Sequence, residues 1–149
     1  MDIANARDVL AKTFDAQPLD GLTVLDLSQI YNGPYASFLM ALAGANVIKI
    51  ERAGPGDLFR SMTFFAKWVG GSESPNFLAW NRNKRSIALD LKNPADLADA
   101  KKLISKADVM VQNFRPGVME KIGLHAAAAR ELNPRLVYGQ ITGYGETGP

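Results

Sequence analysis

Apolar runs of strand length alternate with segments of helical pattern from Thr23 onward, and this alternation constrains the fold of the 149-residue chain most. Its first repeat reads TVLDLS (23–28), GPYASFLMALAG (33–44) and NVIKIER (46–52). Strands that alternate with helices are typical of βαβ units, whose crossover connections make neighbouring strands parallel. We therefore expect an α/β fold with a mainly parallel sheet flanked by helices.

The same rhythm continues to the end of the sequence. Gly44 is placed to end the first helix in a left-handed turn, and Asn93 with Pro94 is a typical helix start. Between the second strand and about Asn76 we expect a long loop or an irregular helix. The further strands are expected at 86–91, 108–113 and 135–141, and the further helices at 94–107, 116–122 and 126–133.

The two ends of the chain carry separate expectations. Residues 1–17 are predicted to form an amphipathic helical extension that Pro18 breaks. Residues 18–149 then form one domain, and the sequence stops at a turn directly after its fifth strand. Because a doubly wound sheet is normally covered on both faces, we expect this domain to be truncated.

Composition excludes several classes of function. Seventeen basic and fifteen acidic residues are interspersed and leave a net charge of +2, which predicts neither a nucleic-acid surface nor a membrane surface. The chain has no cysteine, so disulfides, thiolate metal sites and cysteine nucleophiles are ruled out. No stretch approaches the roughly 20 apolar residues of a membrane span. We expect a cytoplasmic enzyme without a metal site.

The turn after the first strand reads SQIYNGP (28–34) and contains one glycine, so it lacks the G-x-G-x-x-G fingerprint of dinucleotide sites. Glu51 ends the second strand, where an acidic residue could hold a ribose hydroxyl. An NAD site therefore stays open as an alternative. The other interpretation of Gly33-Pro34 is a simple helix start.

Basic residues follow three of the expected strands. Arg52, Lys92 and Arg115 would converge beyond the carboxyl ends of the sheet, where ligands of open parallel sheets bind. Several phosphates on one ligand would suit them, as in CoA, although each could also be a solvated loop charge. Residues 113–117 add an amide, an aromatic face and a helix start, which could grip adenine and phosphate. The alternative there is an ordinary proline-initiated helix with Phe114 in the core.

Other polar residues are predicted to have structural roles. His125, the one histidine, is expected on the surface. Asp26 and Asp90 are expected to accept hydrogen bonds from loop amides rather than to act in catalysis. The basic run 81–86 is expected to be solvated.

Four segments together resemble class III CoA-transferases, over Pro18 to Pro149. They are PLDGLTVLDLSQIYNGPYASFLMALAGANVIKIERAGPGD, NRNKRSIALDLK, ADVMVQNFRPGVMEKIGL and LNPRLVYGQITGYGETGP. The resemblance implies that 18–149 are the amino-terminal part of the CoA-binding large domain, of Rossmann-like topology, with the second domain absent. It implies CoA or acyl-CoA as substrate rather than a permanently bound cofactor, and an interlocked homodimer of the full-length enzyme. It also implies a set of CoA contacts at Ile30, Asn32, Arg52, Leu89, Lys92, Asn113, Phe114, Arg115 and Lys121.

The chemistry that the resemblance implies moves CoA from an acyl-CoA to a free carboxylic acid through an aspartyl intermediate. The nucleophilic aspartate is expected beyond Pro149, so no catalytic residue is assigned and this chain alone is expected to be inactive. Two alternatives remain: a fragment of an α-methylacyl-CoA racemase-type enzyme, and a non-catalytic CoA- or nucleotide-binding module.

Overall fold

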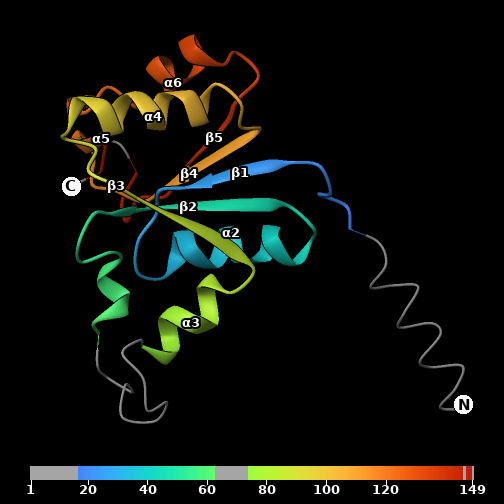
Figure 1. Cartoon of the computed structure of the whole chain (residues 1–149). Coiled ribbons are helices and arrows are strands. Elements are labelled where there is room, and N and C mark those ends of the chain that lie inside the picture. Colours follow the sequence, from blue (N-terminus) through green and yellow to red (C-terminus); the bar gives the residue numbers. More distant parts are fainter. Residues whose placement is uncertain (1–16, 63–73, 146, 149) are drawn as a thin grey trace, which may run out of the picture.

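The computed structural model describes residues 17–62, 74–145 and 147–148, so the predicted helix over 1–17 lies outside the described residues except for Gln17. The described chain begins with β1 and alternates strands with helices as the sequence predicts (Figure 1). The elements are β1 (Thr23–Asp26), α2 (Asn32–Leu42), β2 (Asn46–Arg52), the 3₁₀ helix η1 (Leu58–Arg60), α3 (Pro75–Asn81), β3 (Lys84–Leu89), α4 (Pro94–Ile104), β4 (Val109–Gln112), α5 (Val118–Lys121), α6 (Ala126–Leu132) and β5 (Val137–Gln140).

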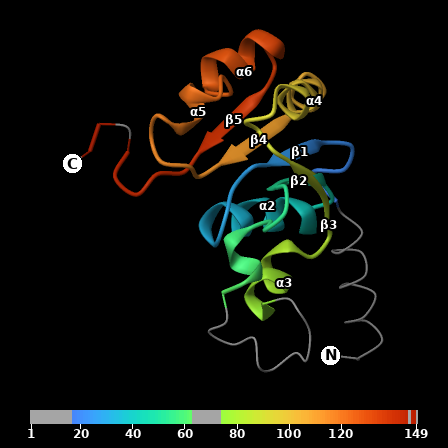
Figure 2. The same ribbon diagram turned by 60° about the vertical axis from the view of Figure 1, so that its left-hand side comes forward.

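All five strands form one parallel sheet in the order β3-β2-β1-β4-β5. The chain starts in the middle of the sheet, builds outward to β3, and then crosses back to place β4 on the other side of β1. Helices α2 and α3 lie on one face, and α4, α5 and α6 lie on the other (Figures 1 and 2). The expected α/β class with a parallel sheet flanked by helices is confirmed.

The face under α4, α5 and α6 holds the larger apolar core. Asn93 caps α4 by accepting a hydrogen bond from the amide of Ala95 at 2.9 Å, as its position before Pro94 predicts. Ala100 and Ile104 of this helix are fully buried. They pack in a cluster with Leu25, Leu27, Ile50, Leu89, Ala107, Met110, Met119, Leu124, Ala129 and Leu136.

The opposite face is packed differently. Its apolar cluster consists of Val24, Ala41, Ala45, Val47 and Val111, and Phe38 of α2 and Phe77 of α3 are buried as well. Buried polar side chains, among them Asp26, Lys49 and Glu51, accompany these apolar ones. Gly44 ends α2 with φ +98°, the left-handed turn that the sequence predicts.

Several element bounds differ from the sequence prediction by up to three residues, and two regions show why. The expected loop up to Asn76 ends in helix α3, which starts at Pro75. Strand β3 begins at Lys84 rather than at Ser86, because Lys84 and Arg85 pair with Val47 and Ile48 of β2. Charged residues are typical of loops, so the sequence places Lys84 and Arg85 before the strand although they belong to this edge strand.

Candidate functional site

The carboxyl ends of β1 and β4 are the place where the direction of strand addition reverses. The connection after β1 leads to α2 on one face, whereas the connections after β3 and β4 lead to helices on the other face (Figure 1). In open parallel sheets such a reversal leaves a crevice between the two departing loops. We call the loops around these strand ends the carboxyl edge.

A pocket of about 220 Å³ lies at this edge above β2 and β3. Its apolar wall comes from Leu27, Ile50, Leu89, Leu91, Phe114, Val118 and Ile122. Arg52 and Lys92 line it with exposed side chains, and Gln29, Glu51 and Asp90 complete the polar part. A flat apolar group can enter such a pocket while anionic groups stay at the two cations.

A second pocket, of about 490 Å³, adjoins the first at Phe114, which lines both. Residues 113–116 form one side of it, and residues 141–145 with Gly148 form the other. The two pockets therefore lie side by side along the carboxyl edge, the first near the end of β3 and the second near the end of β5.

The turn between β1 and α2 borders these pockets and is fastened from both sides. The side chain of Asn113 accepts a hydrogen bond from the amide of Gln29 and donates one to its carbonyl, each at 2.8 Å. Ile30 has φ +67°, and its amide donates to Asp57 Oδ1 at 3.1 Å. Gly33 allows the chain to pass against Ser28, because a Cβ at position 33 would lie 2.1 Å from that of Ser28.

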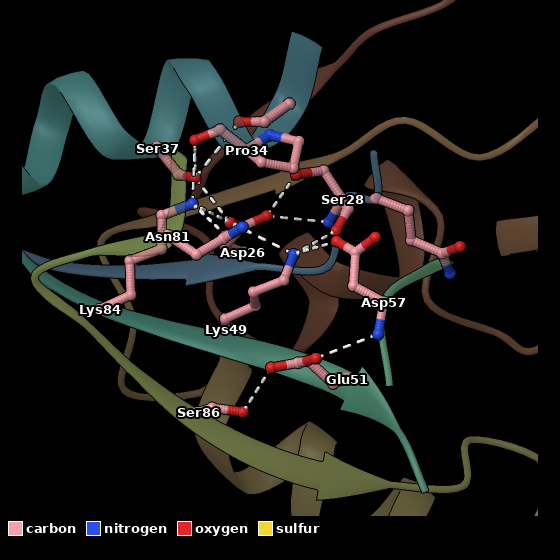
Figure 3. A network of polar contacts seen from close by, with 12 residues as sticks. Asp26, Ser28, Pro34, Ser37, Lys49, Glu51, Asp57, Asn81, Lys84 and Ser86 are labelled. Atoms are coloured by element: carbon pink, nitrogen blue, oxygen red, sulfur yellow. Dashed lines mark hydrogen bonds and ion pairs between the residues drawn. The ribbon is translucent and has the colours of Figure 1, made fainter. Parts of the chain in front are cut away.

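A buried charge network lies beneath this turn (Figure 3). Asp26, which is 0% exposed, accepts hydrogen bonds from Ser37 Oγ at 2.6 Å and Lys84 Nζ at 2.9 Å, and from the amide and hydroxyl of Ser28. Lys49 Nζ lies 3.9 Å from Asp26 Oδ2. Burial by itself raises the pKa of Asp26, but the two ammonium groups and the hydroxyls outweigh burial and lower it below its ordinary value.

Glu51 is committed to protein partners. Arg60 donates to both of its oxygens at 2.6 and 2.7 Å, Ser86 Oγ donates at 2.7 Å, and the amide of Asp57 donates at 3.0 Å. Although burial raises its pKa, these donors lower it to about 2. A ribose hydroxyl would have to displace one of them, which argues against the NAD alternative.

The structure brings most of the predicted site residues together at the carboxyl edge. Arg52, Leu89, Lys92 and Phe114 line the first pocket, and Asn113, Phe114 and Arg115 line the second. The remaining three, Ile30, Asn32 and Lys121, line neither pocket.

Several residues of the edge escaped the sequence analysis. Lys49 and Asp57 are 1% and 2% exposed and form an ion pair at 2.9 Å. A signal for Lys49 exists in β2, where the charged Lys49 and Glu51 alternate with Ile48 and Ile50. This alternation indicates a strand with one polar face.

The predicted roles of three polar residues have mixed outcomes. Asp26 and Asp90 accept hydrogen bonds from the loop amides of Ser28 and Lys92, as expected. His125 is half-buried rather than on the surface, because it directly follows Leu124, which is anchored in the core at 0% exposure. Within 17–62, 74–145 and 147–148, no group of three or more His, Asp or Glu side chains could hold a metal ion. No helix among the same residues is long and apolar enough to cross a membrane.

The fold and this edge define a doubly wound α/β protein with a ligand crevice at its topological switch point. Comparison with known families identifies it further. The chain belongs to CoA-transferase family III, whose family model matches residues 19–149.

Relatives of known activity support this membership. The acetyl-CoA:oxalate CoA-transferase of Acetobacter aceti is 42% identical over 132 residues, which cover 89% of this chain and 33% of the relative. The human succinyl-CoA:glutarate CoA-transferase is 42% identical over 133 residues, covering 89% and 30%. This chain therefore spans about a third of the length of the curated relatives.

A solved structure gives the same result. A CAIB/BAIF family protein from Brucella suis superposes with a TM-score of 0.81 at 37% identity, over 89% of this chain and 35% of that one.

Proposed function

We propose that this chain binds CoA and acyl-CoA at the carboxyl edge and forms part of an enzyme that moves CoA between an acyl-CoA and a free carboxylic acid. The observation that carries this proposal is the first pocket, where an apolar wall adjoins Arg52 and Lys92. An adenine ring suits the wall, and the phosphates of CoA suit the cations.

The adjacency of the two pockets at Phe114 supports a direction for the ligand. With the nucleotide between Arg52 and Lys92, the pantetheine arm extends past Phe114 toward Asn113 and Arg115 in the second pocket. This proposal keeps Ile30, Asn32 and Lys121 as CoA contacts through the resemblance to the family. The names of the relatives support CoA thioesters as substrates, with CoA as substrate rather than as a permanently bound cofactor.

We further propose the aspartyl route of the family for the complete enzyme. A carboxylate attacks the acyl-CoA thioester, which gives a mixed anhydride and frees the CoA thiolate. The thiolate attacks the aspartyl carbonyl, which releases the first acid and leaves an aspartyl-CoA thioester. The acceptor carboxylate then attacks this thioester and frees the thiolate again, and the thiolate attacks the acceptor's carbonyl in the new anhydride, which gives the product acyl-CoA and restores the aspartate. Asp26, Glu51 and Asp57 are held in buried ion pairs, which makes them poor nucleophiles and supports a nucleophile beyond Pro149.

The remaining expectations also stay proposals. We propose that residues 18–149 are the amino-terminal part of the CoA-binding large domain, that the complete enzyme is an interlocked homodimer, and that it acts in the cytoplasm.

Isothermal calorimetry on the 149-residue chain tests CoA binding against NAD. We expect CoA to bind more tightly, and Arg52→Ala, Lys92→Ala and Arg115→Ala each to weaken it by about 1–3 kcal/mol, the scale of a charge-assisted hydrogen bond. The control is Lys106→Ala, which removes an exposed cation after α4 and should leave the affinity unchanged. Tighter binding of NAD, or equal losses in the control, would refute the proposal.

A further inference from the structure

The turn between β1 and α2 holds a β-branched residue in a conformation that such residues avoid. Ile30 has φ +67°, in the left-handed region, where a β-branched side chain is strained. Strain of this kind persists only when surrounding groups hold it. The amide of Ile30 is held by Asp57 Oδ1 at 3.1 Å, and the preceding Gln29 is held by Asn113.

Asp57 is itself fixed in place. Its Oδ1 also accepts the amide of Phe59 at 2.9 Å, and its Oδ2 pairs with Lys49 Nζ at 2.9 Å. Lys49 Nζ in turn donates to the carbonyl of Ser28 at 2.8 Å. The Asp57–Lys49 pair therefore contacts two backbone groups of the turn, the carbonyl of Ser28 and the amide of Ile30, which lie on either side of Gln29. Figure 3 shows Lys49 with Asp57 and Ser28.

The network around this pair has equal numbers of positive and negative charges, but burying them costs free energy of desolvation. Two carboxylates, Asp26 and Asp57, face two ammonium groups, Lys49 and Lys84, and all four side chains are at most 2% exposed. Buried ion pairs often stabilise a fold less than apolar residues of similar size. The backbone contacts of this one give it a specific effect, which is the conformation of the turn.

We propose that Asp57 is a positioning residue for CoA: by holding Ile30 in the left-handed conformation, it fixes the turn whose Gln29 lines the first pocket and is hydrogen-bonded to Asn113 in the wall of the second. The inference rests on the proposed function, in which Arg52 and Lys92 receive the nucleotide. It assigns to Asp57 a role in ligand binding although its carboxylate is buried and touches no ligand.

Two charge-balanced double variants test the hydrogen bond to Ile30. Lys49→Met/Asp57→Asn keeps an acceptor at position 57, whereas Lys49→Met/Asp57→Leu removes it. We expect the leucine variant to bind CoA at least tenfold more weakly than the asparagine variant. Adenosine 3′,5′-bisphosphate, which can fill only the first pocket, should lose less affinity than CoA between the same two variants. Equal CoA affinities of the two variants, or a loss for the bisphosphate as large as that for CoA, would overturn the proposal.

A second comparison and a control make the result specific to the turn. Adding Ile30→Gly should cost the leucine variant less CoA affinity than it costs the asparagine variant, since glycine adopts positive φ without a hold and the lost side chain is common to both. The control Asp99→Asn/Lys102→Met neutralises an exposed ion pair on α4 in the same chemical way and should change neither affinity. Equal effects of Ile30→Gly in the two variants would contradict the proposal.

Hydrogen exchange without ligand separates this inference from the proposed function. The amides of residues 29–32 should exchange at least tenfold faster in the leucine variant than in the asparagine variant, while those of β1 and β4 stay protected. Unchanged exchange means that Asp57 does not hold the turn. Should the unaltered chain bind no CoA, the proposed function fails and the ligand role of Asp57 fails with it, whatever the exchange rates.

Discussion

The two faces of the sheet are stabilised by different kinds of interaction. Under α4, α5 and α6 the buried side chains are almost all apolar, as at Ile104 and Met110. Under α2 the strands contribute Asp26 and Lys49, which lie opposite each other in neighbouring strands, and Lys84 joins them from β3. The apolar face favours compactness, whereas the charged face favours one particular backbone path at the carboxyl edge.

Removing one charge from the network should cause the largest loss. Lys84→Met leaves Asp26 with a single ammonium group 3.9 Å away, and breaking a buried pair costs about 4 kcal/mol. Urea unfolding measures the change. Lys102→Met, which breaks an exposed pair, is the control and should show no measurable change. If Lys84→Met lowers the free energy of unfolding by less than the deletion of a single methyl group does, the charged face is not stabilised as described.

Acid should weaken the charged face selectively. The folded-state pKa of Glu51 is about 2 against an ordinary 4.5, so its contribution is fully present above pH 4.5 and is lost as the pH falls toward 2. The shift corresponds to about 3 kcal/mol. Unfolding midpoints measured from pH 6 to pH 2.5 should fall less steeply in Glu51→Gln. Parallel curves for the two proteins would contradict the assignment.

A methyl group should be tolerated in β5 and not at the start of α2. Gly33→Ala places a Cβ 2.1 Å from that of Ser28, and such overpacking costs about 2 kcal/mol. Gly139→Ala in β5 meets its nearest atoms at 3.6 Å and should change stability by less than about 0.5 kcal/mol. Thermal unfolding distinguishes the two, and equal effects would show that the turn has room to move.

The smallest expected effect lies on the apolar face. Ile104→Val removes one methyl group from a fully buried side chain and should cost about 1 kcal/mol. Ile87→Val on the exposed edge strand is the matched control, with an expected cost under about 0.5 kcal/mol. If both lose the same amount, the core under α4 is less tightly packed than the burial indicates.

Much of the fold could be predicted from the sequence, because alternating patterns and helix caps are local signals. The bounds of β2 and the cap at Asn93 agree with the prediction. Helix α3 could not be predicted in the same way, since its residues 75–81 show no clear apolar period and their helical state depends on packing against α2 and η1.

The residues that line the pockets could be predicted where they lie at the ends of strands. Arg52, Lys92 and Phe114 follow directly from the topology of a parallel sheet. Asp57 could not be found this way, because its contacts with Lys49 and Ile30 depend on how the loop after β2 folds back over the sheet.

The strand order has a consequence for how the chain folds during synthesis. The strands β1, β2 and β3 are made first and pair in sequence, whereas β4 must return to β1, where Met110 lies opposite Leu25. Contacts over such sequence separations close late, because the intervening chain loses entropy when its ends meet. The crevice between β1 and β4 is therefore expected to be among the last features to form on the ribosome. Hydrogen exchange on ribosome-bound nascent chains stalled at increasing lengths should show protected amides in β2 and β3 at shorter lengths than in the turn at Gln29.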